Sequence, residues 1–222
     1  MLRLLYLLPI LFYPCLALSQ KPAIPVPQGY FVIQSAEGDL DQDDIPELVV
    51  AYNTEELKER SFKNVTRDLI VYKRSGDQWV KWRSSTQALY GSRGGGMLGD
   101  PFDTLQIEQG ILLITQQGGS SWKWHFTDKY RFQEEELYLI GYTSMSGAPC
   151  EYWQEVDFNV STGKMIIAKE WEDCDSEAAG KKISETVSVK DLKVTLQTRH
   201  DKRLHVVTPR EGLEVFVSTG KH

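Results

Sequence analysis

The chain has 222 residues, and its 25 Lys and Arg against 31 Asp and Glu give a net charge of −6. Affinity for nucleic-acid phosphates comes from clustered basic side chains, so this balance excludes nucleic acid as an expected partner. The chain contains no linker rich in Pro, Gly or Ser and no long run of like charge, which predicts one compact domain with a sizeable core.

The N-terminal stretch has the composition of an export signal. Residues 4–18 are almost wholly apolar after a single positive charge, and Ala17 and Ser19 supply the small side chains of a cleavage site. We therefore expect a signal peptide over 1–19 and a mature domain over 20–222, located in the periplasm or secreted. The apolar run is short for a membrane span, so no transmembrane segment is expected after signal removal.

Three prolines, Pro22, Pro25 and Pro27, lie at the start of the expected mature chain. Proline has no backbone N–H to donate to a strand ladder, so this segment is predicted to be an extended lead-in that lies over the surface. Strand-like sequence begins after it, at 31–33.

Carboxylates fall at alternate positions in the next segment, at Asp39, Asp41 and Asp43, and a further acid follows at Glu47. A loop that wraps a hard cation needs this spacing, because side chains at positions 1, 3 and 5 converge inward, position 7 offers a carbonyl and a later acid closes the shell. The predicted metal ligands are therefore these four carboxylates and the carbonyl of Ile45. Both flanks read as strands, which argues against an EF-hand; the alternative is an ordinary solvated turn.

This loop resembles the calcium-binding repeat of integrin α-subunit propellers and related FG-GAP proteins, in which Gly-Asp-Leu-Asp-Gly-Asp-Gly-x-x-Asp runs into a strand. Within 38–43 the Gly-Asp-Leu-Asp run and Asp43 match that pattern, whereas Asp44 stands in place of a glycine and Glu47 in place of the closing Asp. The resemblance implies calcium as the bound ion. It covers only 38–52 and occurs once, whereas such a propeller repeats the motif in several blades.

Runs with a period of two residues continue through the rest of the chain, separated by turn residues at regular spacing. This pattern predicts an all-β, antiparallel fold, either a sandwich or a propeller-like meander with a few short helices. The expected strands are 31–33, 48–52, 67–73, 78–83, 104–107, 111–115, 123–132, 137–142, 153–160, 165–171, 186–189, 193–197, 204–207 and 215–217. The helix candidates are 55–62, 84–89 and 176–182.

The middle of the chain carries a second group of motifs: Gly-Asp-Pro-Phe at 99–102, Gly-Gly-Ser-Ser-Trp at 118–122 and Tyr-Arg-Phe at 130–132. Together with the single acidic loop, they resemble a group of uncharacterised exported bacterial proteins. The resemblance implies an envelope location and a shared β fold, and it brings no catalytic residues with it.

Trp122, Trp124 and Phe126 alternate along one predicted strand, so their side chains lie on one face, with Lys123 and His125 on the other. Such a face, next to flexible small residues, could stack against a sugar ring or an aromatic ligand. The alternative is core packing, because large aromatic side chains commonly fill sandwich interiors.

Cys150 and Cys174 remain as a pair once the signal, with Cys15, is removed, and in an exported chain they are predicted to form a disulfide. No catalytic residues are assigned, because none of the four histidines lies in a nucleophile-elbow or HExxH context. His125 and Asp128 could form a base and its orienting acid, but one strand would place them on opposite faces.

Together these features favour an exported, calcium-binding, non-enzymatic β domain that acts as a binding or interaction module for an envelope protein or glycan. Two alternatives stay open: a periplasmic hydrolase acting on an envelope glycan or peptide, and a structural β scaffold without a ligand. Turnover of an envelope substrate would separate the hydrolase from the other two.

Overall fold

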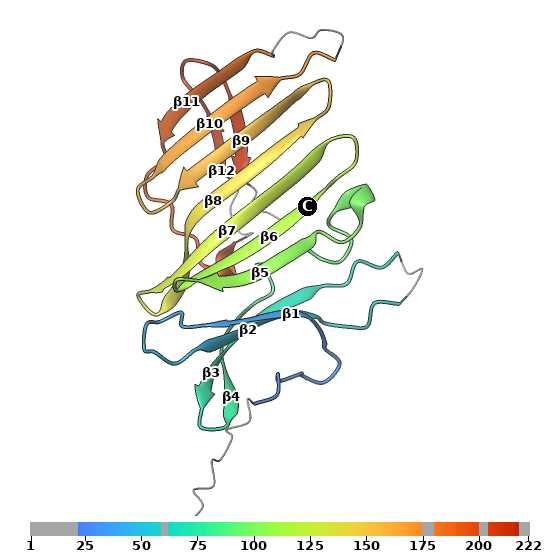
Figure 1. Ribbon diagram of the computed structural model, residues 1–222, viewed down its shortest axis with the longest axis vertical. Coiled ribbons are helices and arrows are strands. Elements are labelled where there is room, and N and C mark those ends of the chain that lie inside the picture. The colour runs from blue at the N-terminus through green and yellow to red at the C-terminus, as the bar shows by residue number, and fades with distance from the viewer. Residues whose placement is uncertain (1–21, 59–61, 175–179, 200–203, 218–222) are drawn as a thin grey trace, which may run out of the picture.

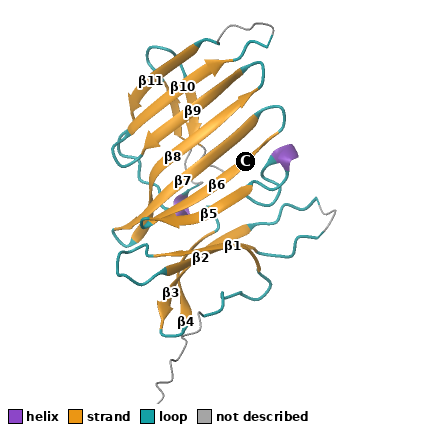
Figure 2. Cartoon of the chain, viewed as in Figure 1, coloured by secondary structure: helices purple, strands orange, loops and turns teal. Residues whose placement is uncertain are grey.

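The computed structural model describes residues 22–58, 62–174, 180–199 and 204–217, so the predicted signal peptide at 1–19 lies outside it. The fold in these ranges is all-β and antiparallel, as predicted (Figure 1 and Figure 2). The strands are β1 (Phe31–Gly38), β2 (Glu47–Asn53), β3 (Arg67–Ser75), β4 (Gln78–Ser85), β5 (Phe102–Glu108), β6 (Ile111–Gly119), β7 (Lys123–Gln133), β8 (Glu136–Ala148), β9 (Tyr152–Asn159), β10 (Lys164–Trp171), β11 (Lys182–Ser188), β12 (Leu204–Val207) and β13 (Glu214–Val217). Two short 3-10 helices are η1 (Gly96–Leu98) and η2 (Leu196–Thr198).

The chain runs as a meander through three sheets, because each strand pairs with a neighbour in sequence. Strands β1 to β4 form the first sheet, β5 to β11 form the second, and β12 and β13 form a separate hairpin. The two larger sheets meet where β1 lies beside β5 (Figure 1). None of the three sheets closes into a barrel over the described ranges, and the arrangement is consistent with a sandwich.

Residues in the left-handed region make two of the tight turns. Gln109 and Gly110 join β5 to β6, between the strands predicted at 104–107 and 111–115, with φ of 51° and 75°, a conformation that matches the twist of paired strands. Glu134 and Glu135 join β7 to β8 with φ of 49° and 65°, which is unusual for residues other than glycine. Arg83 from β4 donates to the Glu135 carbonyl at 2.6 Å and so helps to hold this second turn.

The main hydrophobic core lies against one face of the seven-stranded sheet. One face of the first sheet, the β12–β13 hairpin and the segment that leads into η2 all contribute buried side chains to it. Examples from these elements are Val49, Leu69, Ile114, Ile167, Val194 and Val215. The core therefore ties the first sheet and the β12–β13 hairpin to the seven-stranded sheet.

The other face of the first sheet has a smaller core, centred on Val50, Tyr52 and Ile70. The proline-rich lead-in lies along this face. The Tyr52 hydroxyl donates to the Pro25 carbonyl, and the Trp79 indole donates to the Pro22 carbonyl at 3.4 Å. These contacts confirm the predicted extended lead-in.

The predicted helix at 84–89 is wrong. Ser85 ends β4, and its hydroxyl then accepts the N–H groups of Gln87 and Ala88 at 3.0 and 3.1 Å. A serine that bonds nearby backbone in this way offers the chain an alternative to helical hydrogen bonds. The segment therefore forms a turn and not a helix.

The other two helix candidates, 55–62 and 176–182, fall partly outside the described residues, and their described parts contain no helix. The predicted strand at 193–197 is also wrong, because η2 begins there, although Thr195 makes an isolated bridge with Tyr138. Across the described ranges, no helix is long and apolar enough to cross a membrane.

Candidate functional site

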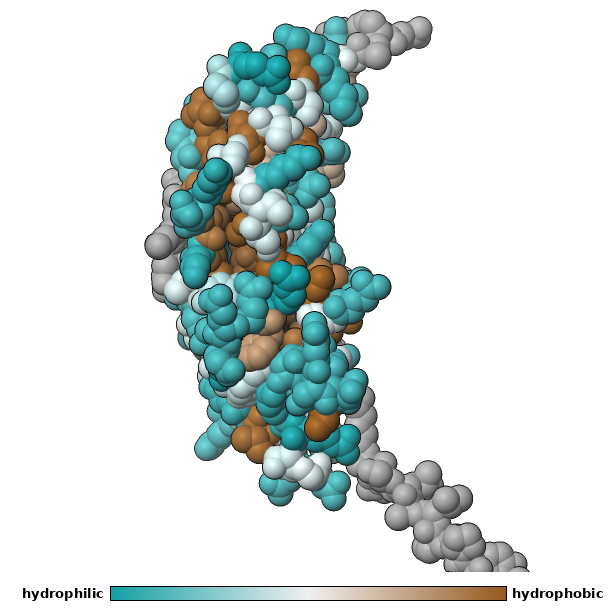
Figure 3. Space-filling model, turned by 90° about the vertical axis from the view of Figure 1, so that its left-hand side faces the viewer, coloured by the Kyte–Doolittle hydropathy of each residue, from teal (hydrophilic) through white to brown (hydrophobic). Residues whose placement is uncertain are grey.

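The acidic loop joins β1 to β2 at the edge of the molecule, beside the β5–β6 turn (left in Figure 1). Figure 3 shows this side, where hydrophilic side chains predominate around a more apolar middle. Leu40 anchors the loop in the main core at 1% exposure. Gly38 is required where β1 passes β5, because a Cβ there would lie 2.6 Å from the Ile107 side chain. Both contacts fix the loop at the junction of the two larger sheets.

The loop backbone wraps around the carboxylate of Asp39. That carboxylate accepts the N–H groups of Gln42 at 2.7 Å, Asp43 at 3.2 Å and Asp44 at 3.0 Å. Gln42 and Asp44 both adopt a φ of 65°, so Asp44 takes the left-handed conformation for which the FG-GAP pattern has glycine. Asp tolerates this region better than most residues, because its short side chain can bond locally.

Three of the five predicted metal ligands converge. One carboxylate oxygen from each of Asp39, Asp41 and Asp43 lies within 4.8 Å of the other two. Ile45 is held in the same loop, because its N–H donates to the Asp43 carboxylate at 2.8 Å. The fourth predicted acid, Glu47, is set apart at the start of β2.

Glu47 has a structural task in the loop. It is 1% exposed, and one of its carboxylate oxygens accepts the N–H of Leu40 at 2.7 Å. Burial raises the pKa of Glu47 above its ordinary value. The carboxylate therefore clamps the two ends of the loop together, and its second oxygen faces the ammonium of Lys73 at 4.0 Å.

Lys73 on β3 is a site residue that the sequence analysis missed. Its ammonium pairs with Asp41 and lies 3.8 Å from the Asp43 carboxylate. It also sits over the Trp82 ring, 4.3 Å from the centroid. The hydrogen bond to Asp41 raises the pKa of Lys73, so the lysine stays charged. A cation thus already occupies one side of the acidic cluster.

The second oxygen of Asp41 is the observation that favours a further ligand. Asp41 Oδ1 is buried and has no hydrogen-bond partner among the described residues. An unpaired buried carboxylate oxygen is costly and calls for an explanation, of which a bound ion is one. All the converging ligands are carboxylate oxygens, the donor type that calcium and magnesium prefer. The residues present therefore fit a hard divalent cation.

The three predicted ligand-binding aromatics do not form one exposed platform. Phe126 is buried in the main core at 5% exposure, and Trp124 stacks on it with ring centroids 5.8 Å apart. Tyr90 meets both rings edge-on at 5.8 Å. Core packing therefore accounts for Trp124 and Phe126, whereas Trp122 precedes β7 and contacts Tyr152.

The glycine-rich segments pack against each other. The N–H of Gly119 donates to the Gly95 carbonyl at 2.8 Å, and a Cβ on Gly118 would lie 2.7 Å from the Gly95 Cα. Only residues without a side chain permit this approach. The segment before η1 and the end of β6 are therefore glycine-rich because their backbones touch.

Asp128 is committed to a buried ion pair. It accepts Arg199 Nε at 2.5 Å and a terminal guanidinium nitrogen at 3.0 Å, and both side chains are at most 1% exposed. Tyr130 donates to the same carboxylate at 3.2 Å, and burial raises its pKa well above the ordinary value. Burial likewise raises the pKa of Tyr142 to about 12. His125 lies on the opposite, exposed face of β7, so it and Asp128 do not form a base and its orienting acid.

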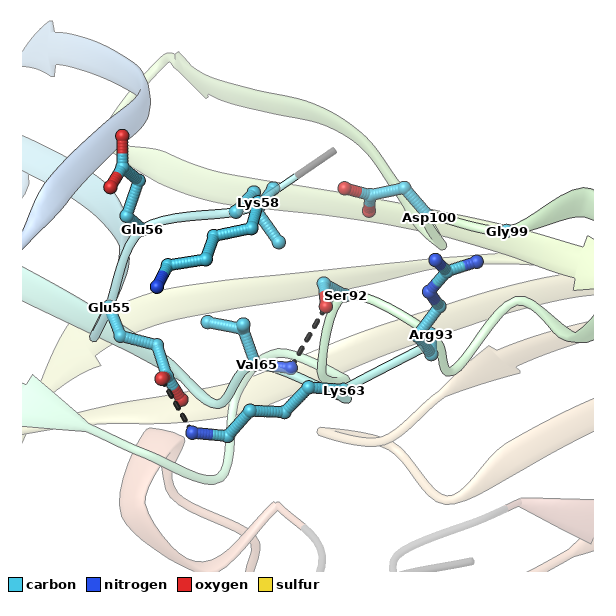
Figure 4. Close-up of a pocket in the computed structure, with 10 residues that line it drawn as sticks. Glu55, Glu56, Lys58, Lys63, Val65, Ser92, Arg93, Gly99 and Asp100 are labelled. Carbon is cyan, nitrogen blue, oxygen red and sulfur yellow. Dashed lines mark hydrogen bonds and ion pairs between the residues drawn. The ribbon is translucent and has the colours of Figure 1, made fainter. Parts of the chain in front are cut away.

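A depression of about 550 Å³ lies between the β2–β3 loop and the segment around Ser92, away from the acidic loop (Figure 4). Its charged side chains have both signs, and Lys63 pairs with Glu55 at 2.5 Å. Ser92 accepts the Val65 N–H at 2.9 Å, and Asp100 pairs with the buried Arg67. These groups hold the loops together, and they do not present one sign of charge to a ligand.

Comparison of the chain with protein-family models, with curated proteins and with solved structures finds no match. The class of this molecule is defined by its own fold and loop: it is an all-β, antiparallel protein with a carboxylate-lined loop at the junction of two sheets. The resemblance to FG-GAP proteins stays a hypothesis carried by the loop residues alone.

Proposed function

We propose that this protein is an exported, non-enzymatic β domain that binds one calcium ion in the β1–β2 loop and presents a surface to another component of the envelope. The observation that carries the cation site is the convergence of Asp39, Asp41 and Asp43 within 4.8 Å, together with the unpaired buried Asp41 Oδ1. Calcium accepts six to eight oxygen ligands in flexible geometry, which suits a loop of carboxylates and carbonyls.

The bound ion would act on the junction between the two sheets. It would neutralise three carboxylates that otherwise repel one another, and it would fix a loop whose ends are β1, which adjoins β5, and β2, which is central in the first sheet. Ion binding to the folded state alone stabilises that state by mass action. Calcium is therefore proposed as a structural ion that stiffens the interface between the sheets.

Export is proposed on two grounds. The first is the composition of residues 1–19, and the second is the disulfide between Cys150 and Cys174, whose Cα atoms are 5.1 Å apart. Disulfides persist in oxidising compartments such as the periplasm and the cell exterior. An extracellular location also supplies the millimolar calcium at which weak sites of this kind fill.

Thermal unfolding tests the cation site. With a dissociation constant of ~0.1 mM, calcium at ~1 mM adds about 1.4 kcal/mol to the free energy of unfolding, which raises Tm by roughly 3–6 °C for a domain of this size. The chelator EGTA should reverse the shift, and Asp41→Asn should abolish it. Asp44→Asn is the matched control, because Asp44 lies outside the converging triad, and it should keep the shift. Equal melting of the wild type in calcium and in chelator would refute the site.

A further inference from the structure

At the opposite ends of the strands from the acidic loop, three partly exposed aromatic side chains lie in series. Trp122 precedes β7, Tyr152 begins β9 and Trp171 ends β10. The Trp122 and Tyr152 ring centroids are 5.0 Å apart, and those of Tyr152 and Trp171 are 6.4 Å apart. We call these three residues the aromatic strip. It continues the core-facing side of β9 and β10, beyond the side chains that are fully buried.

Lys169 places a positive charge in the middle of this strip. Its ammonium lies 3.4 Å from the centroid of the Tyr152 ring and 5.0 Å from that of Trp171. Lys169 has no carboxylate partner and no hydrogen bond among the described residues. Burial lowers its pKa, as expected for a cation that loses water without gaining an anion.

The two acids that flank Trp171 in the sequence are engaged elsewhere. The Glu172 carboxylate accepts the Trp153 indole N–H at 2.8 Å and the Cys150 N–H at 3.2 Å. Glu170 points to the other face of β10 and pairs with Lys182 at 3.0 Å. Glu151 is exposed and is close enough to help raise the pKa of Tyr152, after burial, which is the larger cause. Lys169 is thus left for an external anion.

The polar atoms of the strip are also unused. The hydroxyl of Tyr152 and the indole N–H groups of Trp122 and Trp171 donate to no atom of the described residues. The strip is nevertheless held in place, because the Cys150–Cys174 disulfide links the turn before β9 to the segment after β10. A preorganised set of rings, donors and a cation loses little entropy when it binds a ligand.

We propose that the aromatic strip and Lys169 form a binding site for an acidic sugar, a uronate unit of a polysaccharide. The C–H groups of a pyranose ring carry partial positive charge and suit the electron-rich faces of the two indoles. The uronate carboxylate then accepts a charge-assisted hydrogen bond from the Lys169 ammonium. The sugar hydroxyls accept the unused indole and phenol donors.

Charge decides the ligand class. A neutral sugar would leave the Lys169 ammonium without an anion. Nothing would then offset the free energy that is lost when the sugar displaces water from this charge. A simple acidic peptide would supply the carboxylate but no flat C–H face for the indoles. The inference rests on the proposed function, because it identifies the proposed envelope partner as an acidic polysaccharide. Binding at this site does not depend on the cation in the β1–β2 loop.

The test is binding of purified oligosaccharides, measured by calorimetry. The probes are tetragalacturonate, a mannuronate tetramer and a hyaluronan tetrasaccharide, each with its fully methyl-esterified form as the neutral counterpart, and poly-glutamate as the anion without rings. At least one uronate should bind. Its neutral ester should bind at least about tenfold more weakly, since one hydrogen bond to a charged group is lost. All titrations are run in calcium and in EGTA, so that a failure of the cation site is recognised separately.

Lys169→Gln and Trp122→Ala should each weaken uronate binding by about tenfold or more while circular dichroism stays unchanged. Lys164→Gln is the matched control, because Lys164 is exposed on the other face of the same strand, and it should keep wild-type affinity. The proposal is overturned if none of the three uronates binds, if the methyl ester or poly-glutamate binds as tightly, or if Lys169→Gln binds like the wild type. Lys169→Gln removes the charge and keeps a polar side chain on a strand position that is not fully buried, so it remains decisive even if Trp122→Ala fails to fold.

Discussion

Asp128→Ala is expected to lower the free energy of unfolding by about 3–5 kcal/mol, the usual cost of leaving one partner of a buried ion pair without the other. Arg199 would then be buried beneath Phe126 and Tyr142, with its guanidinium 5.6 and 5.7 Å from the two ring centroids. Tyr130 would lose its acceptor as well. For a domain of this size the melting temperature should fall by roughly 6–20 °C.

Two further variants make this result specific. His125→Ala, on the exposed face of the same strand, should change stability by less than about 0.5 kcal/mol. The double replacement Asp128→Leu with Arg199→Met should be less destabilised than Asp128→Ala, because both charges are then absent. Denaturant unfolding measures all three. If Asp128→Ala unfolds at the wild-type midpoint, the ion pair does not hold the C-terminal segment on the sheet.

Loss of the disulfide should be the second large effect. Cys150 and Cys174 are 24 positions apart, and a closed loop of this length restricts the unfolded chain by about 3.5 kcal/mol in the chain-entropy account. Reduction should therefore lower the denaturant midpoint of the wild type. A variant with Cys150→Ser and Cys174→Ser should show the lower midpoint already and should not respond to reductant. An unchanged midpoint on reduction would contradict this prediction and would mean that the disulfide adds nothing to the stability of the folded protein.

The sequence predicts local features of this fold well. Alternation and turn residues locate most strands. The left-handed turn at Gln109 and Gly110 lies between the strands expected at 104–107 and 111–115, because these two residues favour that backbone conformation locally. The disulfide and the extended lead-in are confirmed for similar reasons, since a cysteine pair and a proline run restrict the chain directly. The convergence of Asp39, Asp41 and Asp43 follows from spacing within one loop.

The features that the sequence does not reveal depend on strand register. Lys73 reaches the acidic loop because β2 and β3 pair with Leu48 opposite Tyr72, which places Lys73 next to Glu47. Tyr152 meets Trp171 because β9 and β10 pair along their whole length. Periodicity gives the face of a side chain but not its partner on the next strand.

Burial by distant segments explains two further features that the sequence does not decide. Asp128 and Arg199 are 71 positions apart, and no local pattern marks either as buried. Trp124 and Phe126 share a face with each other as expected, but that face is the one the core covers. Whether an aromatic face is a platform or a core is decided by what packs on it, and here the covering residues come from elsewhere in the chain.

Calcium titration of the wild type and of Lys73→Met tests whether the β1–β2 loop binds a cation. The Lys73 ammonium lies among the carboxylates of Asp41, Asp43 and Glu47 and therefore opposes the approach of a second cation. Removing a charge that pairs with one ligand, Asp41, and lies 3.8 Å from another, Asp43, should tighten calcium binding at least about tenfold. Lys164→Met, on the outer face of β10, serves as the control and should bind like the wild type. The expected result is one ion per chain, bound more tightly by Lys73→Met. Absence of binding heat from both proteins, or weaker binding by Lys73→Met, would contradict the proposed cation site.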